Sequence, residues 1–373
     1  MAGDIFINLV TDAEDITQVT GERPLVRRLC NQSLAHLCGL QEWPFLWTLD
    51  WFQTTAEYTT GTVSITDGSA VITGTGTTWT AAMVGRKIRF EGSIANYTIK
   101  TFTSTTSITL DQTYQGTTDT DATYTIFKDE YLLRADVDSQ KRIRQAENGI
   151  ALFSLSATEF DEWYPSPTSM GIPSLDVFQG KATKTYTTGT ISLPASSRTL
   201  TGSGTSWTTA EGVGKGTKLK IGTSIFTVNT VDSDTQLTLY EANGTTAVAA
   251  GTTYTAILDN YVVQLHSAPD EVLTYYYRFQ RVPAVMDADN DVPDLPYPMH
   301  PLIGLRMLPT LWRMKGQTAR ALEAQAAFGK ELLQWIQKYS LPVLDQRRPI
   351  HPFALRRFNE DARWPADTGF PLT

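Results

Sequence analysis

Three aspartates at alternate positions, Asp287, Asp289 and Asp291, are the residues whose types and spacing come nearest to a metal site. They match the first ligands of a calcium-binding loop, in which carboxylate oxygens surround the ion. Such a loop needs glycine at its sixth position for a sharp turn and a bidentate glutamate at its twelfth. Val292 and Pro298 stand at those positions. We therefore predict a solvated acidic linker and no bound metal.

The other candidates for catalysis or metal binding also lack the partners they need. Lys215 lies among glycines but is followed by glycine, whereas a phosphate-binding loop has Ser or Thr there. Ser203 stands in a glycine-rich β turn and not in the strand-to-helix elbow that exposes a nucleophile. No pair of carboxylates stands in a recognisable frame for glycoside cleavage. The four histidines show no ligand spacing: His36, His266, His300 and His351. The sequence predicts neither an enzyme nor a cofactor.

Length and composition indicate a globular protein of two or three domains. The chain has 373 residues, of which 41% are hydrophobic and 19% charged, which is typical of chains with separate cores. A net charge of -8 excludes a nucleic-acid-binding surface over the whole protein. No run approaches the roughly 20 apolar residues that span a bilayer. The first residues also lack the basic segment and the cleavage site of a secretory signal, so we expect neither membrane contact nor secretion.

The two cysteines, Cys30 and Cys38, do not form a disulfide scaffold. They stand eight residues apart on a predicted helix, which places them roughly 12 Å from each other. A disulfide tolerates only about 7 Å between Cα atoms. We expect both to be buried and reduced.

One stretch of the chain occurs twice, and this repeat determines the predicted domains. Residues 61–80 read GTVSITDGSAVITGTGTTWT, and residues 189–208 read GTISLPASSRTLTGSGTSWT. Further matches follow in the same order as far as residues 129–133 and 259–263. Thr, Val, Ile and Tyr alternate with polar residues between glycine-rich turns, a pattern typical of short strands. We predict two copies of one small all-β module, a sandwich or barrel, at residues 59–130 and 189–260.

Each module has a tryptophan at the same place, Trp79 in the first and Trp207 in the second. One interpretation is a core residue that covers one end of the module. The alternative is an exposed platform on which a sugar ring stacks. Duplication favours the core, because a fold needs its core tryptophan in every copy, whereas a binding site need not be duplicated.

The segments around the modules, residues 1–58, 131–188 and 261–340, are expected to form one discontinuous host domain. Apolar residues at helical spacing predict an amphipathic helix over residues 22–43, and two more helices follow residue 300. The stretch from Trp43 through Phe45 and Trp47 carries too many large rings for an isolated strand, so we expect a shared core or a surface that another subunit covers. Residues 261–283 predict a hairpin that turns at residues 267–270.

The expected fold class is therefore α+β. A helical bundle joins an antiparallel β host domain, with the two duplicated small all-β modules inserted at loop tips between neighbouring host strands. An extended C-terminal arm, residues 341–373, follows.

The arm is rich in proline but too apolar for a solvated linker. A segment with apolar anchors and no fold of its own is typical of one that lies on a partner. Packing on its own domain and disorder are the alternatives. The residues that we expect to bind the partner are Arg347, Arg348, Ile350, Phe353, Leu355, Arg356, Arg357, Phe358, Trp364 and Phe370.

The host segments resemble bacteriophage head-to-tail adaptor proteins, also called neck or tail tubular ring proteins. The resemblance covers the host, and it depends on the order of several short motifs. These are EWPFLW (42–47), YLLRADV (131–137), SATEFDEWYP (156–165), GIPSLDVFQG (171–180), LTYYYRFQRVP (273–283) and DVPDLPYPMHPLIGL (291–305). The threonine- and glycine-rich modules resemble β insertions of phage virion proteins, and a minimal adaptor would lack them.

The resemblance implies a homo-oligomeric ring, twelve-fold to match a portal, in the neck of the virion between capsid and tail. Before assembly the protein would lie in the cytoplasm of the bacterial host. Its arms would hold the portal protein, its lower side would carry a downstream tail or nozzle protein, and double-stranded DNA would pass through its lumen. A net negative chain fits that role because an acidic lumen repels phosphates. The modules would project outward, where fibres or decoration proteins could contact them.

Two other functions are considered beside the adaptor ring. One is a receptor- or glycan-binding virion protein that uses the paired modules. The other is a different tail-completion component, which has the same structural needs as a ring protein.

Overall fold

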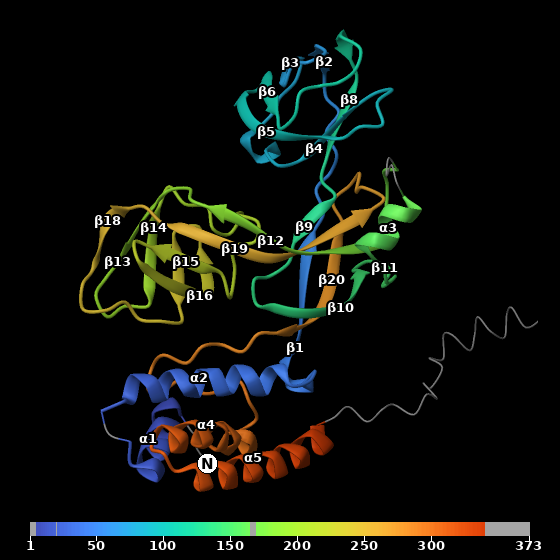
Figure 1. Cartoon of the computed structure of the whole chain (residues 1–373). Coiled ribbons are helices and arrows are strands. Elements are labelled where there is room, and N and C mark those ends of the chain that lie inside the picture. Colours follow the sequence, from blue (N-terminus) through green and yellow to red (C-terminus); the bar gives the residue numbers. More distant parts are fainter. Residues whose placement is uncertain (1–4, 20, 165–168, 340–373) are drawn as a thin grey trace, which may run out of the picture. The chain divides into compact units, whose positions relative to one another are not determined.

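The computed structural model describes residues 5–19, 21–164 and 169–339, except for the side chains of residues 140, 141, 182 and 183. These residues form two compact units. Helices make up one unit, which comprises Asn8–Phe45 and the described residues 295–339. Strands make up most of the other, which comprises Leu46–Asp294 and Ile5–Ile7. Figure 1 labels the elements of both.

The helical unit contains most of α1 (Phe6–Thr17), then α2 (Arg23–Gly39), α4 (Pro301–Met314) and α5 (Thr318–Tyr339). One-turn helices lie at Pro44–Leu46 and Tyr297–Met299. The predicted N-terminal helix is confirmed: α2 has Pro24 in its first turn, where a missing N–H costs nothing, and it ends at Gly39. Its two cysteines are free and buried, as predicted.

The two copies of the repeat have the same strand order. In the first copy the order is β7-β2-β3-β6-β5-β4-β8, and in the second it is β18-β13-β14-β17-β16-β15-β19. Corresponding strands follow one another in the same sequence along the chain. Each copy curls its strands around one continuous core. Both copies are therefore all-β, as predicted.

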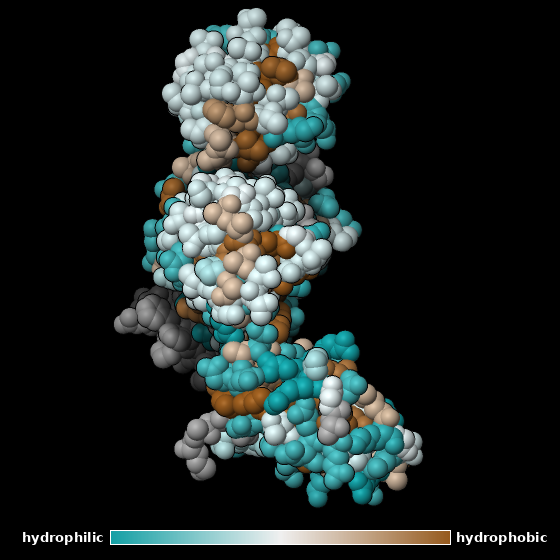
Figure 2. Space-filling model, turned by 90° about the vertical axis from the view of Figure 1, so that its left-hand side faces the viewer, coloured by the Kyte–Doolittle hydropathy of each residue, from teal (hydrophilic) through white to brown (hydrophobic). Residues whose placement is uncertain are grey.

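The strands of the first copy are β2 (Thr62–Ile65), β3 (Val71–Thr75), β4 (Lys87–Phe90), β5 (Tyr97–Ser104), β6 (Ser107–Leu110), β7 (Asp119–Ala122) and β8 (Tyr124–Phe127). Those of the second are β13 (Thr190–Leu193), β14 (Thr199–Ser203), β15 (Lys218–Ile221), β16 (Ser224–Ser233), β17 (Gln236–Leu239), β18 (Val248–Thr252) and β19 (Thr255–His266). On the face shown in Figure 2 the β unit is mostly pale, as expected for a surface rich in threonine and glycine.

The predicted fold class, a helical bundle with a β host domain and two small β insertions, is wrong. Strands hold 37% and helices 25% of the part of the chain that the structure describes, and the antiparallel sheets are large. The second copy shares a ten-stranded sheet with the surrounding segments. Its last strand, β19, also pairs with β12 (Leu175–Tyr186) and β9 (Glu130–Leu132). β11 (Phe153–Ser156) pairs with β12 and completes this sheet.

The physical reason lies at Asn260, where the sequence suggested that the module ends. Asn260 is fully buried within β19. Its side-chain amide donates to the backbone oxygen of Leu133 at 2.6 Å and to that of Gly212 at 3.1 Å. Because the amide nitrogen has these partners inside the fold, the strand continues through a residue type that usually ends one.

The predicted hairpin over residues 261–283 is also wrong. β19 and β20 (Thr274–Arg281) follow each other in the chain but lie in different sheets. β20 is the centre of a three-stranded sheet between β1 (Trp47–Gln53) and β10 (Val137–Gln145). Residues of both sheets, among them Val263, Tyr275 and Phe279, form one core. The first copy consequently connects strands of two different sheets, β1 and β9, which are not neighbours.

Candidate functional site

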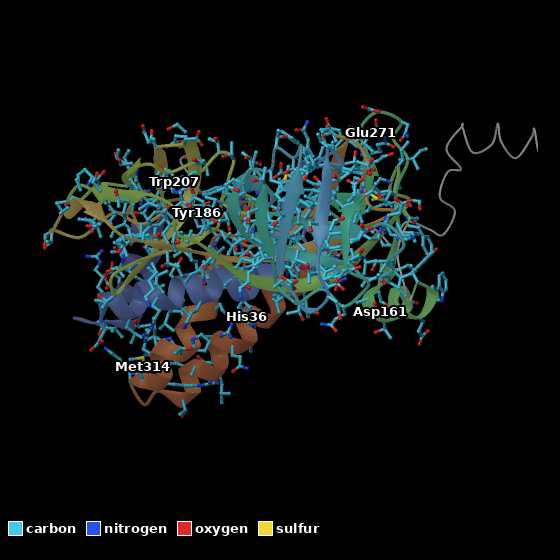
Figure 3. The ribbon with its side chains drawn as sticks, turned by 90° about the horizontal axis from the view of Figure 1, so that it is seen from above. His36, Asp161, Tyr186, Trp207, Glu271 and Met314 are labelled. Atoms are coloured by element: carbon cyan, nitrogen blue, oxygen red, sulfur yellow. The ribbon has the colours of Figure 1, made fainter. Side chains whose placement is uncertain are left out.

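Each copy of the module buries its tryptophan in the same hydrogen-bonded arrangement. Trp79 and Trp207 are both 0% exposed. The indole Nε1 of Trp79 donates to the hydroxyl of Tyr124 at 3.0 Å, and that of Trp207 donates to the hydroxyl of Tyr254 at 2.8 Å. Figure 3 shows Trp207 among the strands of its copy. A sugar stacks only on an accessible ring face, so neither residue can be the platform that the glycan-binding alternative requires.

The three residues of the predicted inter-subunit aromatic surface differ in burial. Trp43 is fully buried in the helical unit, where its Nε1 donates to the backbone oxygen of Leu37 at 2.8 Å. Its ring stacks on Phe45 at 5.5 Å and meets Tyr339 edge-on at 6.5 Å. Trp43 is thus a core residue, and a fully buried ring offers nothing to a second subunit. Phe45 and Trp47 are partly buried, and their contact with another subunit stays a prediction.

The aspartates of the predicted acidic linker support the local backbone. The Oδ2 atom of Asp291 accepts hydrogen bonds from the backbone nitrogen of Asp287 at 2.7 Å and from that of the next residue at 2.8 Å. The backbone oxygens of Asp289 and Asp291 accept from the nitrogens of Ile7 and Phe6, at 3.0 and 2.8 Å. These are N–H groups of the first turn of α1, which have no partner within the helix. Among the described residues, no group of His, Cys, Asp and Glu is placed to hold a metal ion.

The ten residues of the predicted partner-binding arm, Arg347 to Phe370, lie outside the described residues. They stay a prediction.

Helix α5 carries two apolar sides, of which only one is packed within its unit. Ala321 lies in a core cluster with Leu308 and Trp312 of α4, and Phe328 lies beneath Arg306, whose guanidinium carbon is 5.9 Å from the ring centroid. These contacts define the packed side.

The second side follows Leu322, Ala326, Gly329 and Leu333, at the spacing of four, three and four residues that keeps side chains on one helix face. Leu322 is 64% exposed and Leu333 is 59% exposed. Ala326 is also exposed, and Gly329 is partly buried. We call this set the α5 stripe. Because two large aliphatic side chains on one helix face point into solvent, the stripe is a candidate surface for contact with another chain.

The sequence contained the signal for the α5 stripe, because the apolar residues that predict this helix do not all lie on one face. A helix of 22 residues needs one apolar face of about 100° to pack against a neighbour. Here the residues at 321, 324, 328, 332, 335 and 339 form one face, and those of the stripe form another. Apolar residues over such a wide arc indicate that the helix packs against two neighbours and not one.

A second open surface lies on the three-stranded sheet. In an antiparallel sheet, residues that are paired across strands share a face. One face is formed by the buried Tyr275, Tyr277 and Phe279. The opposite face is exposed in large part, with Trp51 55% and Leu49 47% accessible. It carries at paired positions Leu49, Trp51, Tyr276, Arg278, Arg142 and Arg144. None of the described residues at paired positions on this face is acidic, so it is locally positive on an acidic protein.

A scan of the sequence against protein-family models and a search of curated proteins found no match. Within the described residues, no helix is both long enough and apolar enough to cross a membrane.

Proposed function

We propose that the chain is a structural virion protein that assembles into a ring and connects the portal of a phage head to the tail. The observation that carries this proposal is the α5 stripe, an apolar helix face that no described residue of the chain covers. Burying one leucine side chain contributes about 1.5–3 kcal/mol. Two such side chains in each subunit therefore favour association.

The occupant that fits the stripe is another copy of the chain. Ala326 and Gly329 lie between the two leucines, and small residues allow a neighbouring helix to approach to the short end of the 8–10 Å range of helix packing. In a ring the stripe of one chain packs on a different face of the next chain, because a stripe that packs on its own equivalent gives only a two-fold dimer. The positive sheet face around Arg142 and Arg278 offers a second contact, since its neighbour would be a chain of net charge -8.

The position of the ring between head and tail rests on the resemblance of the host segments to head-to-tail adaptors. The same net charge supports passage of DNA through the lumen, because like charges keep the phosphate backbone from adhering to the wall. The arm, residues 341–373, would hold the portal protein.

The first prediction concerns self-association. Leu322→Lys together with Leu333→Lys is expected to convert the ring to smaller species, because each change places a charge in an apolar contact. A loss of only 1.4 kcal/mol per contact already raises the dissociation constant of that contact tenfold. Mass photometry and negative-stain microscopy measure the result. The control is Gln334→Lys, a solvent-exposed position of the same helix outside the stripe.

Circular dichroism shows whether the leucine variants keep the fold. A wild-type chain that stays monomeric at every concentration, or leucine variants that still form the wild-type ring, would contradict the proposal. Docking to purified portal rings tests the position in the particle: removal of residues 346–373 should abolish docking and leave the fold intact.

A further inference from the structure

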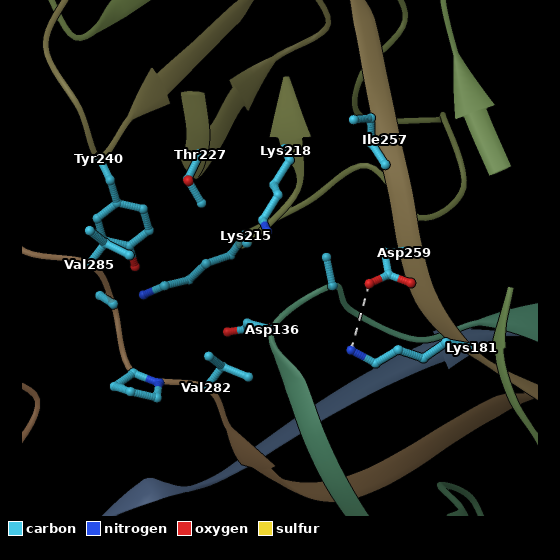
Figure 4. A pocket seen from close by; sticks show the side chains of 14 residues that line it. Asp136, Lys181, Lys215, Lys218, Thr227, Tyr240, Ile257, Asp259, Val282 and Val285 are labelled. Carbon is cyan, nitrogen blue, oxygen red and sulfur yellow. Dashed lines mark ion pairs between the residues drawn. The ribbon is translucent and has the colours of Figure 1, made fainter. Parts of the chain in front are cut away.

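The β unit contains a cavity of about 280 Å³ at the junction between the second copy and the segments around it. Strands β12, β15, β16 and β19 line it, together with residues 135–136 before β10, the loop of residues 215–216, Tyr240 and the segment of residues 282–285. Figure 4 shows Lys215 and Lys218 entering it from the second copy, with Asp136 at its base. This volume is close to the lower end of small-molecule pockets.

The cavity is positively charged. Three lysines and two aspartates line it. Asp136 is held by Arg134, whose Nε and a terminal nitrogen donate to its two carboxylate oxygens at 2.9 and 2.7 Å. Asp259 lies 3.9 Å from the Nζ of Lys181, which also lies 4.9 Å from the ring centroid of Tyr261. Both carboxylates thus have a cationic partner.

Two ammonium groups are left over. In the part of the chain that the structure describes, neither Lys215 nor Lys218 forms an ion pair, and the Nζ of Lys215 lies 5.7 Å from the ring centroid of Tyr240. Lys215 is partly buried, which makes its charge more costly to leave without a counterion. Lys215 also acts electrostatically on Asp136, which Arg134 already holds, so the three lysines and two aspartates of the lining leave a net formal charge of +1 for an anion.

The loop that presents Lys215 is fixed by direct packing on the host sheet. Gly216 has φ +89°, and a Cβ at this position would come within 2.9 Å of the backbone nitrogen of Asp136. Its own nitrogen donates to the backbone oxygen of Val228 at 2.8 Å. The next residue, Thr217, is 0% exposed. Only glycine allows this approach, so the lysine is held at the cavity and not on a free loop.

This loop is a difference between the two copies that the sequence already contains. Lys87 stands eight residues after Trp79 in the first copy, whereas Lys218 stands eleven after Trp207 in the second. The three additional residues lie before Gly216, because Gly85 is its counterpart in the first copy: both glycines have positive φ. The backbone nitrogen of Gly85 donates to the backbone oxygen of Ile99, and that of Gly216 to the backbone oxygen of Val228, each at 2.8 Å. Val84 stands in the first copy where the second has Lys215, so the lysine that lines the cavity, and not the glycine turn, is specific to the second copy.

The remaining walls are apolar. Ile257 of β19 lines one side, and Val282, Pro283, Ala284 and Val285 line another. Two ammonium groups and an apolar wall in one cavity match a ligand with one anionic group and a hydrophobic body.

The geometry points to a binding site for a small organic anion, a carboxylate or phosphate monoester whose charge meets Lys215 and Lys218. Its apolar body lies against Ile257 and the segment of residues 282–285. A free metabolite and an acidic group of another protein could both supply this chemistry. We propose the free small molecule as the ligand.

Saturation-transfer difference NMR on the full-length protein tests this site, since the method observes the ligand and suits large assemblies. The probes are benzoate and phenyl phosphate, with benzyl alcohol as the uncharged analogue and inorganic phosphate as a competitor. We expect transfer to the ring protons of both anions, little to benzyl alcohol, and a dissociation constant at least tenfold higher for Lys215→Ala with Lys218→Ala. Lys220→Ala on the same strand, outside the cavity, should match the wild type.

The absence of transfer to either anion, or equal transfer in the double lysine variant, would overturn the inference. Equal transfer to benzyl alcohol would overturn the anionic part. Full displacement of phenyl phosphate by an equal concentration of inorganic phosphate would overturn the role of the apolar wall. A second variant, Val285→Asp, is expected to weaken both aromatic anions, since it places a like charge at the exposed edge of the cavity.

Discussion

The packing around each buried tryptophan leaves no room for a side chain on the neighbouring strand. Gly202 lies against the Trp207 ring, and a Cβ there would come within 2.6 Å of its Cη2 atom. Gly74 has the same relation to Trp79, with 2.9 Å. Real Cβ atoms do not approach this closely. The first glycine of each repeated turn, Gly74 in GTG and Gly202 in GSG, is therefore needed for packing against the tryptophan ring.

Gly202→Ala is therefore expected to destabilise the second copy by about 1–3 kcal/mol, the typical cost of overpacking a core. Gly244→Ala is the matched control in the same copy, because nothing lies within 4 Å of its Cβ position and its φ is not positive. The midpoints of urea denaturation measure the difference. Equal midpoints for the two variants would contradict the close packing of Trp207.

Burial controls the chemistry of the cysteine thiols. It raises the pKa of Cys30 from the ordinary 9.0 to about 12, against a smaller opposing effect of Arg27. At pH 8 the thiolate fraction falls from roughly one tenth to roughly one ten-thousandth. We expect Ellman's reagent to leave Cys30 unreacted in the folded protein at pH 8 and to titrate both cysteines in denaturant.

The direction of the pH effect follows from the higher pKa in the folded state. As pH rises past 9, the unfolded chain loses the thiol proton first, so the contribution of Cys30 to stability is complete below pH 9 and is lost as pH rises toward 12. Rapid reaction of Cys30 with Ellman's reagent in the folded protein at pH 8 would contradict this, because it would show that solvent reaches the buried face of α2.

At the scale of the element, strand β20 shows how one strand divides its residues between two environments. Tyr275, Tyr277 and Phe279 are buried, while the tyrosine and arginine between them, Tyr276 and Arg278, face outward. Tyr277 is 2% exposed, and burial raises its pKa above the ordinary range. Neighbouring tyrosines of one strand thus lie in different environments, Tyr277 in the core and Tyr276 on the open face.

This alternation yields a matched pair of substitutions. Tyr277→Ala is expected to lower the free energy of unfolding by about 3–5 kcal/mol, as is typical for removal of a buried aromatic ring. Tyr276→Ala should cost less than about 1 kcal/mol, because its ring lies on the open face. Urea denaturation followed by fluorescence compares them. Similar losses for the two variants would show that the open face is covered in solution. If another chain of a ring covers it, the loss for Tyr276→Ala should fall when the protein is diluted below the concentration at which it assembles.

The sequence predicted local elements well and their partners poorly. Helix α2 has the expected proline in its first turn. At the start of α3 (Ala157–Trp163), Ser156 and Glu159 form a capping box, which is also a local sequence signal. These signals act between residues that are near in sequence. The sheet to which β20 belongs depends on contacts with β1, more than 200 residues away, and no local pattern specifies that pairing.

The same limit applies to the candidate surfaces. The duplication pointed to Trp79 and Trp207 as structural residues, which their burial confirms. The rings from Trp43 to Trp47 predicted either a shared core or a surface that another subunit covers, and the helical unit buries the Trp43 ring beside Phe45 and Tyr339. Which of several rings is buried depends on tertiary packing, and composition alone does not determine it.

For the molecule as a whole, the two copies differ in how they are joined to the rest of the β unit. The core of the first copy consists of residues between Tyr58 and Ile126 alone. That of the second includes Leu132 and Val262, which belong to the surrounding sheet. Glu211 of the second copy also accepts from the backbone nitrogen of Leu132 at 2.9 Å. The first copy is therefore energetically separable, whereas the second is a part of a larger sheet.

The isolated first copy, residues 57–130, is expected to fold cooperatively, and the isolated second copy, residues 186–260, is expected to be less stable by about 2 kcal/mol or more. The second fragment loses the packing of Leu132 and Val262 and the pairing of β19 with β12 and β9, and each buried aliphatic side chain contributes about 1.5–3 kcal/mol. A difference of this size shifts the thermal midpoint by roughly 8–16 °C in domains of this length. Thermal unfolding by circular dichroism measures it, and residues 128–266, which restore β9 and β12, should recover the stability. Two fragments with the same midpoint, or no recovery in the longer one, would mean that the shared sheet adds nothing to the second copy, and the repeat would then consist of two equivalent modules.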